Sequence, residues 1–292
     1  MISSFTNYLA HEKRFSTHTL KAYIRDVESF STFIVTSCDQ EDITEVSSSM
    51  IRSWIVALSE KQNSSKSINR KVSSLRSFYK FLLRENYIDT DPTKGLILPK
   101  VENKIPSFIQ ENHLHQLFDS ISFDDSFSGQ RDQLILELFY GTGIRLSELI
   151  NLEEHAVSLS QKVIKVRGKG NKERIIPVNA TLSSCISSYL DKKSDKFNSP
   201  SSLLIVTNKG EKTYPMFIHR IVKKYLSMVL GAEKKSSHVL RHSFATHLLN
   251  KGADLNAIKE LLGHASLAAT QVYTHNTMDK LKSVFDQAHP KA

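Results

Sequence analysis

Apolar residues recur every three or four positions in three segments of the first 90 residues, and this spacing predicts amphipathic helices. The first segment follows Ser16, a residue type that caps helix N-termini. The three apolar stripes are Leu20, Tyr23, Ile24, Val27, Phe30 and Ile34; Ile51, Trp54, Ile55 and Leu58; and Ile68, Val72, Leu75, Tyr79 and Leu82. Residues 1–90 are therefore predicted to form a helical domain.

The helical pattern stops in the stretch TDPTKGLILPKVENKIP, which holds Pro92, Pro99 and Pro106. Proline fixes the backbone and removes a hydrogen-bond donor, so closely spaced prolines are typical of an extended connector. We therefore predict a linker at residues 91–106 between two domains.

Residues 107–292 mix helical and strand patterns. Residues 112–118, 131–140 and those from Phe217 onward have helical spacing, with Gly252 and Gly263 as helix stops. In residues 163–166 apolar residues alternate with basic ones, and after a glycine-containing turn the apolar residues 175–178 return, which predicts an antiparallel hairpin. Residues 203–206 are a further strand candidate. The predicted fold class is mainly α, with a small antiparallel β-sheet in the second domain.

The composition favours an anionic partner inside the cell. The chain has 39 Lys and Arg against 30 Asp and Glu, a net charge of +9 and a pI near 9.4, which favours a polyanion such as DNA over a merely basic soluble protein. Cys38 and Cys185 show no metal-ligand or disulfide spacing. No apolar run has membrane-spanning length, and the N-terminus is no signal peptide. We expect a cytoplasmic protein with no membrane partner.

The third helix of the first domain has a basic face. Seven basic residues and no acidic one lie between Lys61 and Arg84. The residues about two positions out of step with the apolar stripe are Lys66, Arg70, Ser73, Ser77, Lys80 and Arg84. A solvated surface is the ordinary alternative, but a face of one charge sign without the usual i,i+4 counter-charges favours contact with the phosphates and groove of a nucleic acid.

The segment His238–His275 carries the candidate chemistry, in the motifs HVLRHSFATHLL, LLGH and VYTH. Tyrosine can attack a phosphodiester when cationic donors stabilise the charge that gathers on the phosphate oxygens. Arg241 and the two histidines His238 and His264 are such donors near Tyr273. The GTGIRLSEL stretch adds Arg145, and no acidic cluster suited to Mg²⁺ lies nearby. This pattern predicts phosphoryl transfer without a metal or other cofactor.

These motifs resemble the tyrosine recombinases, and most of all the Xer recombinases (the XerC/XerD type) of bacterial chromosomes. The ordered catalytic set of that family falls on Arg145, Lys169, His238, Arg241, His264 and Tyr273, and the similarity covers essentially the whole chain. The resemblance implies a SAM-like core-binding N-terminal domain that clamps DNA and a catalytic domain at 107–292. It also implies that Lys169, in the hairpin turn, is the general acid, with Lys172 as the second candidate.

The resemblance further implies a 3′-phosphotyrosyl intermediate, a Holliday junction and a tetramer of this chain alone or with a related recombinase on a double-stranded DNA site. Chromosome dimer resolution at cell division, with a DNA translocase of the division septum as a partner, is the expected role. The alternatives are a mobile-element integrase, a type IB topoisomerase-like enzyme and a DNA-binding regulator without catalysis. Integrases often carry an arm-binding domain, for which there is no room before Phe5. The sequence leaves the XerC or XerD role and the target site open.

Individual residues also have structural alternatives. Arg145 can pair with Glu148 on the same helix face. The histidines 238, 242 and 247 could suggest zinc, but no cysteine or carboxylate completes a site, so we expect His242 and His247 to support the helix. In the tail from Met278 to Ala292, Leu281, Val284 and Phe285 have helical spacing. This tail either packs on its own domain or, as the resemblance implies, docks on a neighbouring protomer.

Overall fold

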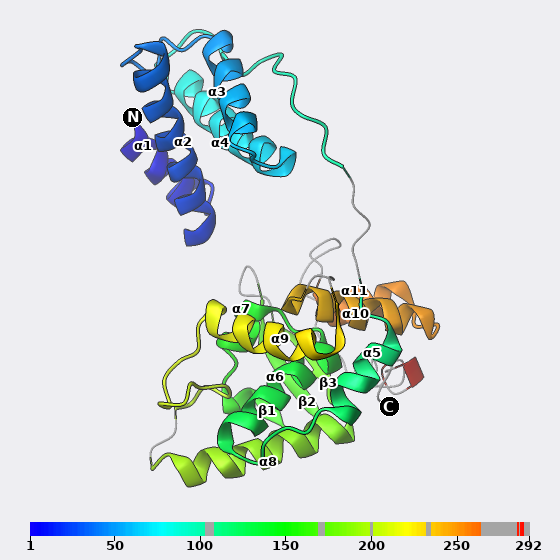
Figure 1. Ribbon diagram of the computed structural model, residues 1–292. Coiled ribbons are helices and arrows are strands. Elements are labelled where there is room, and N and C mark those ends of the chain that lie inside the picture. Colours follow the sequence, from blue (N-terminus) through cyan, green and yellow to red (C-terminus); the bar gives the residue numbers. More distant parts are fainter. Residues whose placement is uncertain are drawn as a thin grey trace. The chain divides into compact units, whose positions relative to one another are not determined.

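The computed structural model describes residues 1–102, 108–168, 173–198, 201–231 and 235–263, together with residues 285, 287 and 288. The chain divides into two compact units, Met1–Lys104 and Ile105–Ala292 (Figure 1). Each unit has its own hydrophobic core. The division falls within the stretch for which the prolines predict a connector.

The amino-terminal unit is helical throughout its regular structure. Its elements are α1 (Ile2–Asn7), the π-helical turn η1 (Tyr8–Glu12), α2 (Thr17–Cys38), α3 (Ser48–Glu60) and α4 (Ser65–Arg84). Each of the three long helices begins with a serine whose hydroxyl accepts a backbone N–H of the first turn; these serines are Ser16, Ser47 and Ser64. Such caps satisfy donors that have no partner within the helix.

The core of this unit forms where α2, α3 and α4 contact one another (Figure 1). All the residues predicted for the stripes of α3 and α4 are buried, and so are Val27, Phe30 and Ile34 of α2. The ring of Trp54 packs edge-on against Phe30 at 5.1 Å between centroids. The helical periodicity thus identified the buried face of each long helix correctly.

The predicted linker at 91–106 is only partly free of the first unit. The carbonyl of Pro92 accepts the Ser48 hydroxyl at 2.6 Å, and that of Pro99 accepts the Asn69 amide at 3.1 Å. Leu96 is buried in the same core. Residues 91–99 therefore belong to the amino-terminal unit, because their apolar side chain and carbonyls find partners on α3 and α4.

The carboxy-terminal unit is built around α6. Its helices are α5 (Glu111–His115), α6 (Phe127–Thr142), α7 (Leu146–Ile150), α8 (Ala180–Lys196), α9 (Pro215–Val229), α10 (Ser237–Asn250) and α11 (Leu255–Leu262), with a π-helical turn η2 (Gln116–Ser120) and a 3-10 turn η3 (Glu154–Ala156). Helix α6 contacts α8, α9 and α10. It is buried on nearly all sides, which explains why its sequence lacks a clear polar face.

The small sheet contains β1 (Val157–Ser158), β2 (Val163–Arg167) and β3 (Glu173–Pro177), all antiparallel in the order β1-β2-β3. The predicted hairpin is confirmed. The strand predicted at residues 203–206 is wrong: this segment makes only isolated bridges at Leu203 and Val206. Its apolar run reflects burial in the core rather than strand pairing. The predicted fold class, mainly α with a small antiparallel sheet, is confirmed.

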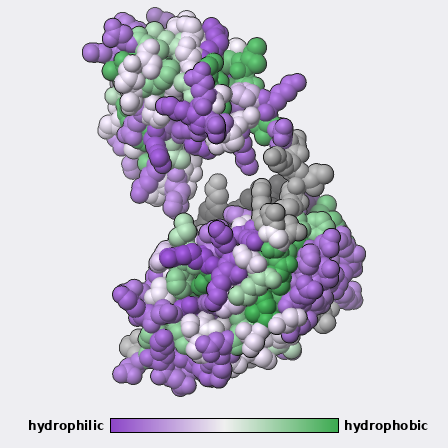
Figure 2. Space-filling model, viewed as in Figure 1, coloured by the Kyte–Doolittle hydropathy of each residue, from purple (hydrophilic) through white to green (hydrophobic). Residues whose placement is uncertain are grey.

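The surface of both units is mixed. On the face drawn in Figure 2, hydrophilic residues predominate over each unit and smaller apolar areas lie among them. No helix within the described ranges combines the length and the apolar character needed to cross a membrane.

The turn after α6 depends on a glycine. Gly143 has φ of 59°, and a Cβ there would lie 2.6 Å from the Phe244 ring and 2.8 Å from Leu262. Gly252, after α10, has φ of 86° with nothing within 4 Å of the corresponding position. An added Cβ would therefore cause both backbone strain and a steric clash at Gly143, but backbone strain alone at Gly252.

We expect Gly143→Ala to destabilise the protein by about 2 to 4 kcal/mol, since a left-handed alanine costs about 1 kcal/mol and the clash adds overpacking. Gly252→Ala should show only the first effect, about 1 kcal/mol. Denaturant unfolding followed by far-UV circular dichroism measures both. Equal losses in the two variants would contradict the predicted clash.

Candidate active site

The turn between α6 and α7 fixes the position of Arg145. Helix α6 ends at Thr142, and the left-handed Gly143 turns the chain. The Thr142 hydroxyl then accepts the backbone N–H of Ile144 at 3.2 Å. Arg145 follows as the N-cap residue of α7, so its side chain starts from a tightly bonded turn.

Glu148, in the first turn of α7, holds Arg145. Its Oε2 accepts the Arg145 backbone N–H and its Oε1 accepts Nη1 of the Arg145 guanidinium, both at 2.8 Å. The ion pair expected from the sequence is thus present. The Glu148 side chain is 2% exposed and that of Arg145 is 33% exposed. Arg145 is therefore anchored at one edge and accessible to solvent at another.

A second arginine that the sequence argument missed completes the partners of Glu148. Arg174 of β3 donates from Nη1 and Nη2 to the two carboxylate oxygens of Glu148, at 2.7 and 2.8 Å. One pattern could have indicated its inward orientation: side chains two apart in a strand share a face, and Ile176, two residues on in the predicted strand, is buried. Burial alone would raise the pKa of Glu148, but the bonds and charges of Arg174 and then Arg145 outweigh it and lower the pKa to about 2.

Arg241 approaches the same place from α10. One of its nitrogens, Nη1, donates to the Gly143 carbonyl, and Nη2 donates to the Leu262 carbonyl at 2.6 Å. Burial, followed by the charges of Arg145 and Arg174, lowers the pKa of Arg241 to about 10. The guanidinium therefore stays protonated at neutral pH although it is buried beside two other cations.

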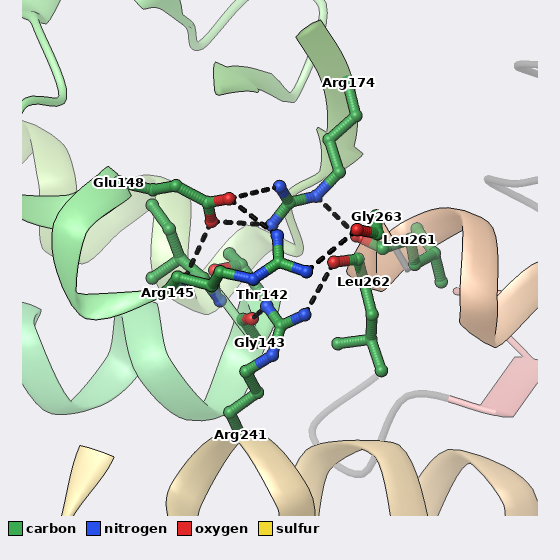
Figure 3. Close-up of polar contacts among 10 residues, drawn as sticks. Thr142, Gly143, Arg145, Glu148, Arg174, Arg241, Leu261, Leu262 and Gly263 are labelled. Carbon is green, nitrogen blue, oxygen red and sulfur yellow. Dashed lines mark hydrogen bonds and ion pairs between the residues drawn. The ribbon is translucent and has the colours of Figure 1, made fainter. Parts of the chain in front are cut away.

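The C-terminal end of α11 joins these side chains. Three consecutive carbonyls accept one arginine each, as Figure 3 shows around the end of that helix. The pairs are Arg174 with Leu261, Arg241 with Leu262, and Arg145 with Gly263. The carbonyl end of a helix carries partial negative charge and favours cations. Segments far apart in the sequence thus meet at one point.

This cluster has the properties of an anion site. Three guanidinium groups surround one carboxylate, so positive charge is in excess. A guanidinium has five N–H donors. Arg145 and Arg241 each use two of their side-chain N–H groups in bonds to described residues. The remaining donors suit the oxygens of a phosphate.

Four predicted site residues lie outside the described residues: Lys169, Lys172, His264 and Tyr273. Two of their neighbouring segments are described. In the sequence, Lys169 and Lys172 lie between β2 and β3, the strand of Arg174. His264 directly follows Gly263, whose carbonyl accepts Arg145.

The histidines of α10 have different surroundings. His238 is exposed in the first turn, three residues before Arg241. His247 is buried, and its Nδ1 lies 3.0 Å from the Tyr140 hydroxyl, in agreement with a supporting role; His242 is half-buried. Within the described ranges, no three His, Cys, Asp or Glu side chains form a group that could hold a metal.

The basic face of α4 is exposed, apart from the half-buried Ser77; its other predicted members are Lys66, Arg70, Ser73, Lys80 and Arg84. Two of its arginines have counter-charges that do not come from i,i+4 positions on α4. Arg70 pairs with the buried Asp26 of α2, and Arg84 pairs with Glu12 at 2.9 Å and with the adjacent Glu85 at 2.8 Å. Asp26 and Glu12 come from other elements, so spacing along α4 could not reveal them.

The C-terminal tail is mostly outside the described residues. Phe285 and Ala288, which are described, are buried in the core of the carboxy-terminal unit. In the single chain these two residues thus pack on their own domain. Docking of the tail on a neighbouring protomer remains a prediction.

Comparison with known proteins gives the family. The profile of the phage integrase family matches residues 107–280, and that of the phage integrase N-terminal SAM-like domain matches residues 2–86. The chain therefore belongs to the phage integrase family, as its resemblance to tyrosine recombinases predicted. Its class is that of the tyrosine recombinases, enzymes of site-specific recombination that cleave and religate DNA.

Among its relatives, the tyrosine recombinase XerC of Anoxybacillus flavithermus is 39% identical over 295 residues, covering 100% of this chain and 98% of the relative. A solved structure of the XerH site-specific recombinase bound to a palindromic difH substrate has a TM-score of 0.73 at 21% identity, covering 97% of this chain and 83% of that one. The Tn1549 transposon integrase with circular intermediate DNA has a TM-score of 0.70 at 20% identity, covering 96% and 98%. These two structures share the fold.

The lowered pKa of Glu148 predicts a pH dependence of stability. Its pKa is about 2 in the folded protein against an ordinary 4.5. Ionised Glu148 then stabilises the fold above pH 4.5, by on the order of 3 kcal/mol, and this contribution is lost as pH falls toward 2. Glu148→Gln removes the titrating group, so the stability difference between wild type and variant should shrink as pH falls from 7 to 3. Parallel curves in denaturant unfolding would contradict this.

Proposed function

We propose that this chain is a site-specific recombinase in which Tyr273 attacks the scissile phosphate of a double-stranded DNA site. Arg145 and Arg241 hold the non-bridging oxygens. The product is a 3′-phosphotyrosyl intermediate with a free 5′-hydroxyl. The bond to tyrosine keeps the phosphodiester energy, so religation needs no ATP.

The arginine pair carries this proposal. Arg145 and Arg241 come from different elements, are fixed by neighbouring carbonyls of α11, and keep N–H donors free of bonds to described residues. Planar guanidinium groups bind phosphate oxygens in pairs and supply the charge that a metal ion would otherwise supply. Such a preformed anion site next to a sequence segment with a tyrosine is suited to nucleophilic attack on phosphorus.

The remaining roles follow from position and family. His238 lies one helical turn before Arg241, on a similar side of α10, and is the proposed acceptor of the tyrosine proton. His264 follows the carbonyl that holds Arg145 and is the proposed donor to the phosphate. Lys169 in the hairpin turn protonates the leaving 5′-oxygen, with Lys172 as the second candidate.

The cellular role is proposed from the relatives. Curated relatives across several bacteria are named tyrosine recombinase XerC, which supports chromosome dimer resolution at cell division over the other roles. We propose that four protomers, of this chain alone or with a related recombinase, exchange strands in pairs through a Holliday junction. The protein acts in the cytoplasm, and a DNA translocase of the division septum is its proposed activator.

A mobile-element integrase is the second candidate. The fold similarity to the Tn1549 transposon integrase spans nearly the whole chain, so fold alone does not separate the two roles. The identity to XerC relatives, 39% over the full length, favours the chromosomal role. Footprinting on host genomic DNA distinguishes them by the site that is bound.

We expect Tyr273→Phe to bind the DNA site like the wild type and to form no covalent adduct, because only the nucleophilic oxygen is removed. A nicked suicide substrate traps the wild-type adduct, which denaturing gels detect. The wild-type adduct should form equally in EDTA, since guanidinium groups replace a metal. An adduct in Tyr273→Phe would assign attack to another residue, and loss in EDTA with recovery in Mg²⁺ would refute the metal-free mechanism.

The α4 face gives a second prediction, for which Lys66 and Lys80 are the best probes because, unlike Arg70, neither is paired with a described residue. Each phosphate contact contributes about 0.9 to the slope of log K against log salt. The double change of Lys66 and Lys80 to Gln should therefore lower the slope by up to about 1.8.

The matched control changes Arg52 of α3 and Lys94 to Gln. Both are exposed in the same unit and lie off α4, so the loss of net charge is equal. A gel-shift titration over 50 to 300 mM salt compares the two double variants, in steps of roughly equal log salt. If both lower the slope alike, α4 makes no specific phosphate contacts.

A further inference from the structure

Among the described arginines of the proposed phosphate site, Arg174 makes the most side-chain hydrogen bonds. Its side chain is 5% exposed. All three of its nitrogens donate: Nη1 and Nη2 to the two oxygens of Glu148, and Nε to the Leu261 carbonyl at 2.8 Å. Arg174 thus fastens β3 to both α7 and the end of α11 (Figure 3).

The chain makes room for this side chain at Gly263. A Cβ there would meet Arg174, 3.0 Å from Cδ and 3.2 Å from Nη1. The φ of 62° at Gly263 also favours glycine. The guanidinium therefore passes close to the backbone directly before His264.

The bonds of Glu148 show what Arg174 does for Arg145. Each carboxylate oxygen accepts two N–H groups, one from Arg145 and one from Arg174. The carboxylate is buried, so a lost bond would leave an acceptor unsatisfied, which is costly. Among the described residues, Arg145 is the other guanidinium bonded to Glu148, and it would supply the missing donor from N–H groups that now bond to no described residue.

We propose that Arg174 is a positioning residue for the phosphate site: by binding both oxygens of Glu148, it keeps one edge of Arg145 available for a DNA phosphate. This rests on the proposed function. Arg174 also adds to the excess positive charge, since its loss would lower the net charge of the three arginines and Glu148 from +2 to +1. It acts through Arg145 and touches no substrate itself.

Removal and rescue test the proposal. Arg174→Met should slow adduct formation on the suicide substrate at least 10-fold under single-turnover conditions, with half-site affinity within about 2-fold of wild type. Adding Glu148→Gln removes the competing carboxylate and restores the charge excess, so the double variant should recover most of the rate. Arg174→Lys keeps the charge without the planar fork and should lie between Arg174→Met and wild type.

The matched control is Arg131→Met. Arg131 is also a buried arginine of this unit, bonded to Asp132 at 2.8 Å, but it does not contact Glu148, so its variant should form the adduct at a rate within about 2-fold of wild type. In Arg174→Met the pKa of Glu148 should rise, because the bonds and charge that lower it most are gone. Acid should therefore protonate Glu148 at a higher pH in this variant than in wild type and raise the rate of the variant relative to wild type, since protonation acts like the Gln substitution. Arg145, Arg174 and Arg241 are the described charged groups that act on this carboxylate.

A binding assay separates this inference from the proposed function. Half-site DNA with single neutral methylphosphonates is scanned in the Tyr273→Phe background, where no chemistry occurs. Neutralising one particular phosphate should lower the affinity of the protein with Arg174. The same change should lower affinity less in Arg174→Met and should lower it again as in wild type in the double variant. If the wild-type protein formed no covalent adduct, the proposed function would be refuted. The binding scan would still test whether Arg174 positions Arg145. A wild-type rate for Arg174→Met, or no recovery in the double variant, would make Arg174 a structural contact only.

Discussion

Glu148 is a buried carboxylate whose four hydrogen bonds come from two arginines on different elements. Three guanidinium groups in such a small region would repel one another, and this repulsion contributes to the lowered pKa of Arg241. The single carboxylate and the carbonyls of α11 make the arrangement stable. The same set of bonds consequently holds together the ends of α6 and α11, the start of α7 and the strand β3.

The sequence predicted features that depend on local spacing. The stripes of α3 and α4, the serine cap of α2 and the β2–β3 hairpin follow from periodicity and capping, which act over a few residues. Residues 203–206 were misassigned because a short buried run looks the same as a strand. The pairing of Arg70 with Asp26 and of Arg84 with Glu12 was not predicted, because ion pairs between elements join residues that are distant in sequence.

The candidate site was predictable in part for the same reason. Arg145 and Arg241 stand in motifs, and the pair of Arg145 with Glu148 is a matter of helix spacing. Arg174 stands in no catalytic motif. Because it lies two residues before Ile176 in β3, its side chain shares the inward face of that residue. This spacing does not indicate which residue it bonds. The roles of the Leu261 and Leu262 carbonyls could not be predicted, since a backbone acceptor has no sequence identity.

Backbone carbonyls are well suited to position cations that must bind an anion. An acid paired with each arginine would fix its geometry but would also cancel its charge and compete with phosphate. A carbonyl fixes a guanidinium through a dipole and leaves the net charge intact. Among the described residues, Arg241 bonds two carbonyls, and Arg145 bonds one carbonyl and one carboxylate. Arg174 bonds the same carboxylate, so these bonds hold the arginines in place and leave the cluster positively charged before an anion binds.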